Sequence, residues 1–255
     1  MLTVRVIPSL LLKNTGLVKT IKFKNPIYIG DPINAVRIFN EKEVDEIVFL
    51  DITKTIENKV PNFDLIQNIA NECFVPFAYG GGIKDIETIK KIFKLGAEKI
   101  IINSAAYYNK SLIANAAEKF GSQSIVVSID FKKKWLGKKE VVVNCGTKPT
   151  GINPLEYAIE MQKLGAGELY INSIDRDGTR MGYDIPLLKE IAENVNIPII
   201  ASGGAGSLED IKQVVNKANV SAAAAGSLFV YYGNQNGVLI NYPERNVLEN
   251  LFYER

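Results

Sequence analysis

Residues 77–83 read Phe-Ala-Tyr-Gly-Gly-Gly-Ile, and residues 199–206 read Ile-Ile-Ala-Ser-Gly-Gly-Ala-Gly. Each run follows a proline, Pro76 or Pro198, and precedes a segment in which apolar residues recur with helical spacing. Glycines between a strand and a helix let backbone amides approach a ligand closely, and the helix N-terminus favours an anion there. Either run alone is consistent with a tight turn, but the pair predicts two matched phosphate sites.

The two glycine runs belong to a repeat that extends along the sequence. The offset of 122 residues between the two prolines also aligns Gly81 with Gly203, Gly82 with Gly204, Glu87 with Glu209, Glu46 with Glu168, and Ile52 with Ile174. An offset of nearly half the 255 residues indicates two copies of one unit. We therefore predict two half-barrels, at roughly 1–121 and 122–245.

Short apolar runs alternate with helical patterns along the chain. The runs lie at residues 4–11, 47–52, 76–79, 99–103, 124–130, 168–173, 197–202 and 221–226, and the Lys-rich segment 132–139 predicts a solvated loop. Eight strand–helix units in 255 residues predict one α/β domain, 1–255, folded as a (β/α)8 TIM barrel. A doubly wound open sheet is the alternative, but it does not account for the half-length repeat.

Composition excludes several classes of function. The net charge is +2 without a basic block, which argues against nucleic acid or an anionic membrane as partner. No apolar run reaches about 18 residues and no signal-peptide pattern is present, so we expect a cytoplasmic protein. Cys73 and Cys145 form no CxxC pair and the chain has no histidine, so we expect no metal and no cofactor. Acid–base chemistry must then come from Asp, Glu, Lys, Tyr or Cys.

Polar residues gather at the carboxyl ends of the predicted strands, where barrel enzymes place their active sites. They are Asp51, Gly80–Gly82, Asn103, Ser104, Asp130, Asp175, Asp177, Gly178, Ser202–Gly204, Gly226 and Ser227. A phosphate site after strands 7 and 8 is common in this fold, and the repeat predicts its twin after strands 3 and 4. We therefore expect a substrate with two phosphate-like ends.

Asp130 is the predicted catalytic residue. It ends an apolar run, where an unpaired acid is costly to bury, so we interpret it as a general acid or base; an ion pair with Lys132 or another cation at the barrel rim is the alternative. At an offset of 119, Ser9 aligns with Ser128 and Leu11 with Asp130. A symmetric site with two carboxylates is therefore absent.

Four charged residues lie at the opposite ends of the predicted strands. They are Arg5, Glu46, Lys99 and Glu168, two basic and two acidic. They could form a closed ring of ion pairs across the barrel bottom, or they could be solvated strand ends, since surface pairs are common and weak.

Taken together, these residues resemble the cyclase (synthase) subunit of imidazole glycerol phosphate synthase over essentially the whole chain. The most specific stretches are residues 45–53, 80–83, 120–123, 173–179, 182–184 and 198–206. The resemblance implies a barrel that arose by half-barrel duplication and forms a heterodimer with a glutaminase subunit on its N-terminal face. Ammonia would pass a charged gate and the barrel interior to a bisphosphorylated ribulosyl substrate.

The resemblance also assigns residues. The gate falls on Arg5, Glu46, Lys99 and Glu168. With Asp51 added from its strand end, the predicted substrate and phosphate contacts are Lys19, Asp51, Gly82, Asn103, Ser104, Asp177, Gly178, Gly204, Gly226 and Ser227. The catalytic pair departs from the family, which has an acid where this chain has Leu11, so the family's standard cyclisation is in doubt.

A group of paralogues looks like this chain. They serve, beside a sugar amidotransferase, the conversion of an acetamido to an acetamidino group on a surface sugar. We therefore interpret the protein as the ammonia-channelling synthase subunit of such an amidotransferase assembly. One alternative is the ordinary histidine-pathway cyclase, with Asp130 alone sufficing. Another is a non-catalytic conduit that activates a glutaminase and passes ammonia to a third protein.

Overall fold

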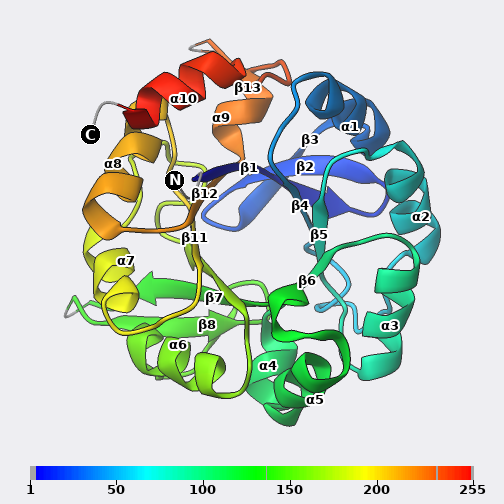
Figure 1. The fold of residues 1–255 in the computed structure, drawn as a ribbon, viewed down its shortest axis with the longest axis vertical. Coiled ribbons are helices and arrows are strands. Elements are labelled where there is room, and N and C mark those ends of the chain that lie inside the picture. Colours follow the sequence, from blue (N-terminus) through cyan, green and yellow to red (C-terminus); the bar gives the residue numbers. More distant parts are fainter. Residues whose placement is uncertain (1–3, 136, 234, 254–255) are drawn as a thin grey trace.

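The computed structural model describes residues 4–135, 137–233 and 235–253, and within them eight parallel strands close into a barrel (Figure 1). In chain and spatial order the strands are β1 (Arg5–Lys13), β4 (Ile47–Asp51), β5 (Phe77–Gly80), β6 (Lys99–Ile102), β7 (Ile125–Lys133), β10 (Glu168–Ser173), β11 (Ile199–Ser202) and β12 (Ala222–Ala225). Pairing of β12 with β1, with Ile7 opposite Ala224, closes the sheet. The predicted (β/α)8 barrel is confirmed, and the doubly wound alternative is wrong.

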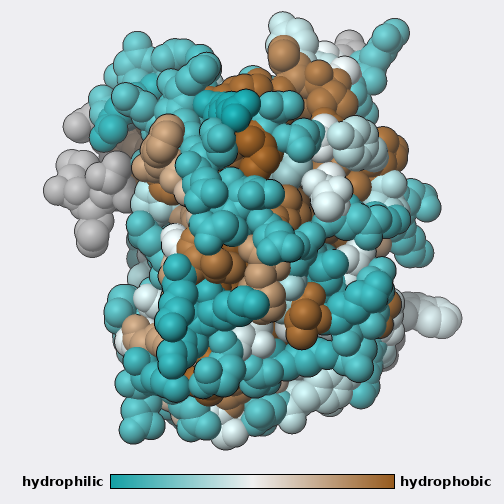
Figure 2. Space-filling model, turned by 90° about the vertical axis from the view of Figure 1, so that its right-hand side faces the viewer, coloured by the Kyte–Doolittle hydropathy of each residue, from teal (hydrophilic) through white to brown (hydrophobic). Residues whose placement is uncertain are grey.

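Helices surround the barrel as an outer layer (Figure 1). The longer ones are α1 (Pro32–Glu41), α2 (Phe63–Glu72), α3 (Ile86–Lys94), α5 (Ser111–Phe120), α6 (Pro154–Lys163), α7 (Ile185–Ala192), α8 (Leu208–Ala218) and α10 (Arg245–Tyr253). Their apolar stripes pack on the strands, and the face that carries α2 and α3 is largely hydrophilic with small separate hydrophobic patches (Figure 2). None of the described helices combines the length and hydrophobicity needed to cross a bilayer.

The two glycine runs end in the same local structure. Asp85 caps α3 and Ser207 caps α8; both have φ −150° and ψ 166°, and their side chains accept from the backbone amides of Thr88 and Asp210. Short polar side chains at this position satisfy amides that the helix leaves free. The equal geometry agrees with the sequence repeat, while the half-barrel duplication stays a prediction.

Two excursions extend the barrel sheet beyond the predicted strands. After β1, the hairpin of β2 (Gly16–Ile21) and β3 (Lys24–Gly30) adds antiparallel strands. After β7, β8 (Lys139–Val143) and β9 (Lys148–Pro149) do the same. The prediction of a loop over 132–139 is wrong at both ends, because pairing with β8 continues β7 through Lys133. Short elements complete the chain: α4 (Ser104–Tyr108), α9 (Ser227–Val230), a 3-10 turn (Ser122–Ser124), β13 (Tyr231–Tyr232) and β14 (Gly237–Val238).

Alternate residues of each barrel strand face the barrel interior. On β10, Leu169 and Ile171 pack outward in the large core under the helices, while Tyr170 packs inward. The inward cluster is small and aliphatic apart from that tyrosine: Ile7, Val48, Ala78, Ile101, Val126, Ile200, Ala222 and Ala224, with Leu50 beside them. We call the barrel interior that these side chains fill the lumen. It lies between the two ends of the barrel.

We expect Gly203→Ala to destabilise the fold by about 2 kcal/mol or more, because position 203 has φ +85° and a Cβ there would lie 2.6 Å from the Ser173 carbonyl oxygen. Gly151→Ala is the matched control, since its φ is +76° but nothing lies within 4 Å of the added carbon. Urea unfolding should show a clearly larger loss for Gly203→Ala. Equal losses would mean that the close approach at the second glycine run contributes nothing.

Candidate active site at the barrel mouth

A pocket opens at the carboxyl ends of the barrel strands. All eleven residues predicted as catalytic or substrate-binding line it: Lys19, Asp51, Gly82, Asn103, Ser104, Asp130, Asp177, Gly178, Gly204, Gly226 and Ser227. They come from eight separate strand ends or loops, so the closure of the barrel brings them together. The structure thus places both predicted phosphate loops on one pocket.

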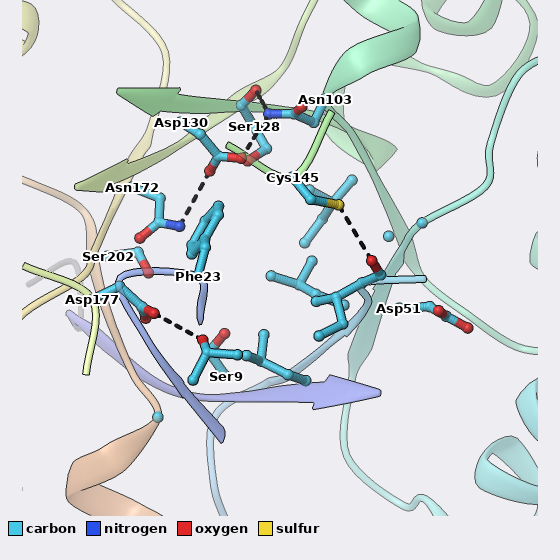
Figure 3. A pocket seen from close by; sticks show the side chains of 18 of the residues that line it. Ser9, Phe23, Asp51, Asn103, Ser128, Asp130, Cys145, Asn172, Asp177 and Ser202 are labelled. Atoms are coloured by element: carbon cyan, nitrogen blue, oxygen red, sulfur yellow. Dashed lines mark hydrogen bonds between the residues drawn. The ribbon is translucent and has the colours of Figure 1, made fainter. Parts of the chain in front are cut away.

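Asp130 is buried at the pocket wall and held by two amides (Figure 3). Its Oδ1 accepts a hydrogen bond from Asn172 Nδ2, and its Oδ2 accepts one from Asn103 Nδ2, each at 3.1 Å. Burial raises the pKa of Asp130 to about 7 and Asp177 adds to the rise, while the bond from Asn172 opposes it. The alternative ion pair is not formed, because Lys132 Nζ donates to the Gly146 carbonyl instead. Asp130 can therefore exchange a proton near neutral pH.

Asn172 is a site residue that the sequence analysis missed. Its amide nitrogen donates to Asp130, yet its buried Oδ1 has no hydrogen-bond partner among the described residues. A turned amide would present that oxygen to a protonated Asp130, so Asn172 can serve both protonation states of the carboxyl. The alternation of side chains along a strand could have indicated it. Asn172 lies four residues after Glu168, so both side chains lie on the inward face of β10.

Leu11 lies at the pocket beside Ser9, both of them on β1, and contributes no proton-carrying group. Cys145 also lines the pocket, but its thiol donates to the Ile52 carbonyl and burial raises its pKa to about 12, so it is a packing residue rather than a nucleophile. Among the described residues, no three His, Cys, Asp or Glu side chains are grouped as metal ligands.

The Asp51 side chain forms its hydrogen bonds within the loop that follows β4. Its Oδ1 accepts from the Thr53 amide, the Thr53 hydroxyl and the Lys54 amide, and its carboxylate is turned away from the middle of the pocket (Figure 3). The buried Oδ2 has no hydrogen-bond partner, with Lys54 Nζ at 3.9 Å. Asp51 therefore shapes the turn after β4, and a substrate contact at its Oδ2 stays a prediction.

The hairpin of β2 and β3 lies across the mouth. Thr20 Oγ1 donates to Asp177 Oδ2 and the Lys22 amide donates to the Asp177 carbonyl, both at 3.0 Å. Phe23 from its tip stands over the pocket (Figure 3). Lys22 and Phe23 both have positive φ, which is unusual for residues with a side chain. The hairpin thus covers part of the pocket that Lys19 and Asp130 line.

At the opposite end, the four predicted gate residues form a closed ring. Arg5 pairs with Glu46 and Glu168, while Lys99 Nζ lies 3.0 Å from Glu46 Oε2 and 2.8 Å from Glu168 Oε2. The glutamates are buried and the two basic side chains are about a quarter exposed. The alternative of solvated strand ends is wrong, and the ring seals the lower end of the lumen with paired charge.

Between the ring and the mouth, one hydroxyl cluster interrupts the aliphatic lumen. Tyr170 is fully buried, and its hydroxyl lies 2.9 Å from Ser9 Oγ and accepts from Ser202 Oγ at 2.8 Å. Burial raises the pKa of Tyr170 to about 12, so the hydroxyl stays neutral. A small polar molecule that crossed the lumen would meet its hydrogen-bond partners here.

Comparison with known proteins agrees with this geometry. Residues 5–236 match the family model described as "Histidine biosynthesis protein". The chain belongs to the imidazole glycerol phosphate synthase subunit HisF family. It is 54% identical to "Putative imidazole glycerol phosphate synthase subunit hisF2" of Pseudomonas aeruginosa, over 96% of this chain and 98% of that protein. It is 43% identical to "Imidazole glycerol phosphate synthase subunit HisF" of Streptococcus mutans, over 91% and 92%.

In this HisF-family chain, Asp130→Asn should gain stability over the wild type as the pH rises. The folded pKa of about 7 lies above the usual value of 3.8, so the folded state keeps a proton that the unfolded state releases between these pH values. Stability of the wild type is therefore lost as the pH rises through 7, by up to about 4 kcal/mol, and the asparagine variant avoids that loss.

Thermal unfolding of both proteins from pH 5 to pH 8.5 measures this difference. The exposed Asp64→Asn variant controls for removal of a carboxylate, and we expect no comparable gain there because its side chain is solvated. Parallel curves for Asp130→Asn and the wild type would show that Asp130 carries no proton near neutral pH.

Proposed function

We propose that this chain is the ammonia-accepting synthase subunit of a glutamine amidotransferase assembly, and that it adds ammonia to a phosphorylated small molecule. The observation that carries the proposal is a single barrel with a closed ion ring at one end and a buried proton-carrying carboxyl at the other. The names of the relatives support an imidazole glycerol phosphate synthase type of subunit.

A glutaminase partner would dock over the ring of Arg5, Glu46, Lys99 and Glu168. Ammonia is small and, once deprotonated, uncharged, so it can cross an aliphatic lumen that excludes ions. The paired charges of the ring would have to part for it to enter. In the lumen, the Tyr170 hydroxyl offers a hydrogen bond half-way to Asp130. The partner and the path are proposals that rest on the ring and the lumen together.

The two glycine runs would bind the phosphates of the substrate. Gly82 precedes α3 and Gly204 precedes α8, each at the N-terminus of a helix that begins with a side-chain cap. Asn103 and Gly226 precede α4 and α9 on the neighbouring strands. Backbone amides at these points attract anions. A ligand with two phosphate groups would span the mouth with its middle beside Asp130.

Two substrates fit this frame. The first is the bisphosphorylated ribulosyl compound of histidine biosynthesis, supported by the family model and by the names of relatives such as the Streptococcus mutans protein. The second is a surface sugar whose acetamido group becomes acetamidino, with a sugar amidotransferase as further partner. Leu11 favours the second, because it removes the proton-carrying group that the family has on β1. A pure conduit would have no use for a buried carboxyl with a shifted pKa.

Lys99→Ala should uncouple glutamine hydrolysis from product formation in the complex with the glutaminase. Removal of Lys99 leaves Glu46 and Glu168 paired to Arg5 alone, and a buried charge without its partner reorganises or takes up water. The measurement is the amount of product formed per glutamine hydrolysed, first with glutamine and then with added ammonium salt.

We expect the ratio to fall severalfold with glutamine and turnover with ammonium salt to persist, since added ammonia enters from the mouth. Lys90→Ala on the exposed side of α3 is the control, and its ratio should match the wild type. An unchanged ratio in Lys99→Ala rules out the gate.

The wild type should turn over the bisphosphorylated ribulosyl substrate about 10²–10⁴-fold more slowly than an ordinary HisF subunit, because Leu11 cannot transfer a proton. Leu11→Asp should recover part of the rate. Leu11→Asn is the matched control, since it is polar and of similar size but carries no proton to exchange.

The measurement is the ammonium-dependent turnover of the wild type, Leu11→Asp and Leu11→Asn at saturating substrate. Wild-type turnover within a few-fold of an ordinary HisF subunit would exclude the sugar substrate as the reason for Leu11 and leave the histidine-pathway reaction. Equal gains in Leu11→Asp and Leu11→Asn would show that polarity at position 11, rather than proton transfer, limits the rate.

A further inference from the structure

Lys19 is a buried amine without a partner. The residue is 5% exposed, its side chain lines the pocket, and its amine has no hydrogen bond or ion pair with the residues that the structure describes. Burial lowers the pKa of Lys19, and the charge of Asp177 only partly opposes that effect. A buried lysine in this state loses its proton far more readily than a solvated one.

Gly226 makes room for this amine. A Cβ at position 226 would collide with Lys19 Nζ, and it would lie 3.0 Å from the Ser9 carbonyl oxygen. The nitrogen is therefore lodged between β1 and the loop that follows β12. Asp130 belongs to β7, which is four strands away from β1 in either direction around the barrel. Figure 3 shows the same arrangement, with Asp130 and Ser9 facing one another across the pocket.

Leu11 lies on the same strand as Ser9 and pairs with Val18, the residue before Lys19. Leu11 and Lys19 line the same pocket, so an acid at position 11 would favour the protonated form of Lys19 by charge attraction. Leucine leaves the amine without that neighbour. The sector of the mouth opposite Asp130 thus contains a nitrogen base rather than a carboxylate.

We propose that Lys19, lodged against Gly226, is the second acid–base residue of this site and takes the place of a carboxylate at position 11. This inference rests on the proposed addition of ammonia at the mouth. When ammonia adds to a carbonyl carbon, an N–C bond forms and the C–O π pair moves to oxygen. The protonated Asp130 gives that oxygen one proton, and the neutral Lys19 amine takes one from the new ammonium nitrogen. Both residues end in their charged forms, and solvent restores them.

Other ionisable groups share the pocket with Lys19. They are Lys13 on β1, Asp51 on β4, Asp130 on β7, Cys145 between β8 and β9, Tyr170 on β10 and Asp177 after β10. Burial raises the pKa of Tyr170 and of Cys145 to about 12, so neither changes charge near neutral pH. Asp130 does titrate in that range, and the experiment must remove it.

Sulfate binding to the isolated chain tests the proposal without a partner or a substrate. Sulfate keeps its charge from pH 6.5 to pH 9, so a change in its affinity reports the protein groups. In Asp130→Asn, affinity measured by calorimetry should fall roughly tenfold over this range as Lys19 loses its proton, the effect of one charge-assisted bond. The double variant Asp130→Asn with Lys19→Arg should bind sulfate tightly at every pH. The double variant Asp130→Asn with Lys19→Met should bind sulfate weakly at every pH.

Two further variants separate the role of Gly226. Gly226→Ala should weaken sulfate binding at pH 6.5 when Lys19 is present and have little effect beside Lys19→Met. Lys24→Met, on an exposed residue of the same hairpin, is the control for loss of one positive charge.

Several outcomes would overturn the proposal. Equal affinity of Asp130→Asn at pH 6.5 and pH 9 would show that Lys19 keeps its proton, and a fall that persists in the Lys19→Arg variant would assign the titration to another group. If sulfate did not bind at pH 6.5, a protonated Lys19 beside Gly226 would be contradicted. None of these results depends on the glutaminase or on the ammonia acceptor, so the proposed function would stand or fall on the Lys99 and Leu11 measurements.

Discussion

The alternation of side chains along strands that close into a barrel is the constraint on which the rest of this structure depends. On β10, Glu168, Tyr170 and Asn172 all face inward, and a rise of about 3.3 Å per residue sets successive levels roughly 6–7 Å apart. The first belongs to the ion ring, the second to the hydroxyl cluster, and the third holds Asp130. One strand therefore fixes the order in which a molecule entering at the ring would meet charge, hydroxyl and acid.

The two ends of the barrel treat buried charge in opposite ways. At the ring, each glutamate pairs with both Arg5 and Lys99, so the cost of burial is offset by mutual attraction. At the mouth, Asp130 accepts hydrogen bonds from neutral groups, and in the described part of the chain the Lys19 amine has no hydrogen bond or ion pair. Their pKa values move toward neutrality as a result. The ring pairs its buried charges with one another, whereas the mouth holds two ionisable groups that can exchange protons.

The barrel could be predicted from the sequence because its signals are local and repeated. Eight apolar runs gave the strands, and the glycine runs gave both loops that precede α3 and α8. Asp130 was predictable because an acid that ends an apolar run is unusual. The hairpin of β2 and β3 was not predicted, because its two-residue turn at Lys22 and Phe23 has positive φ without the glycine or asparagine that usually marks such a turn.

A different limit applies to Tyr170 and Asn172. In the sequence they are ordinary members of a buried strand, and only the closure of the sheet brings Tyr170 to Ser9 and Asn172 to Asp130. Their inward direction follows from the period of two, but their partners do not. Contacts across a barrel join residues more than 40 positions apart, and no local pattern encodes them.

Leu11, where the resemblance implies an acid, would affect two groups at once, so the proposed chemistry can differ from that of the family while the barrel stays the same. A carboxylate at position 11 would serve as a proton carrier, and its charge in the same pocket would also favour the protonated form of Lys19. Leucine removes the carrier and, by the same step, frees the amine to become one. The pocket then exchanges an acid pair for an acid and an amine with no change in the strand register. The ring, the lumen and both glycine runs lie on other residues, so the proposed ammonia supply and phosphate binding would not change with the residue at position 11. A change of ammonia acceptor therefore requires new chemistry at the mouth alone.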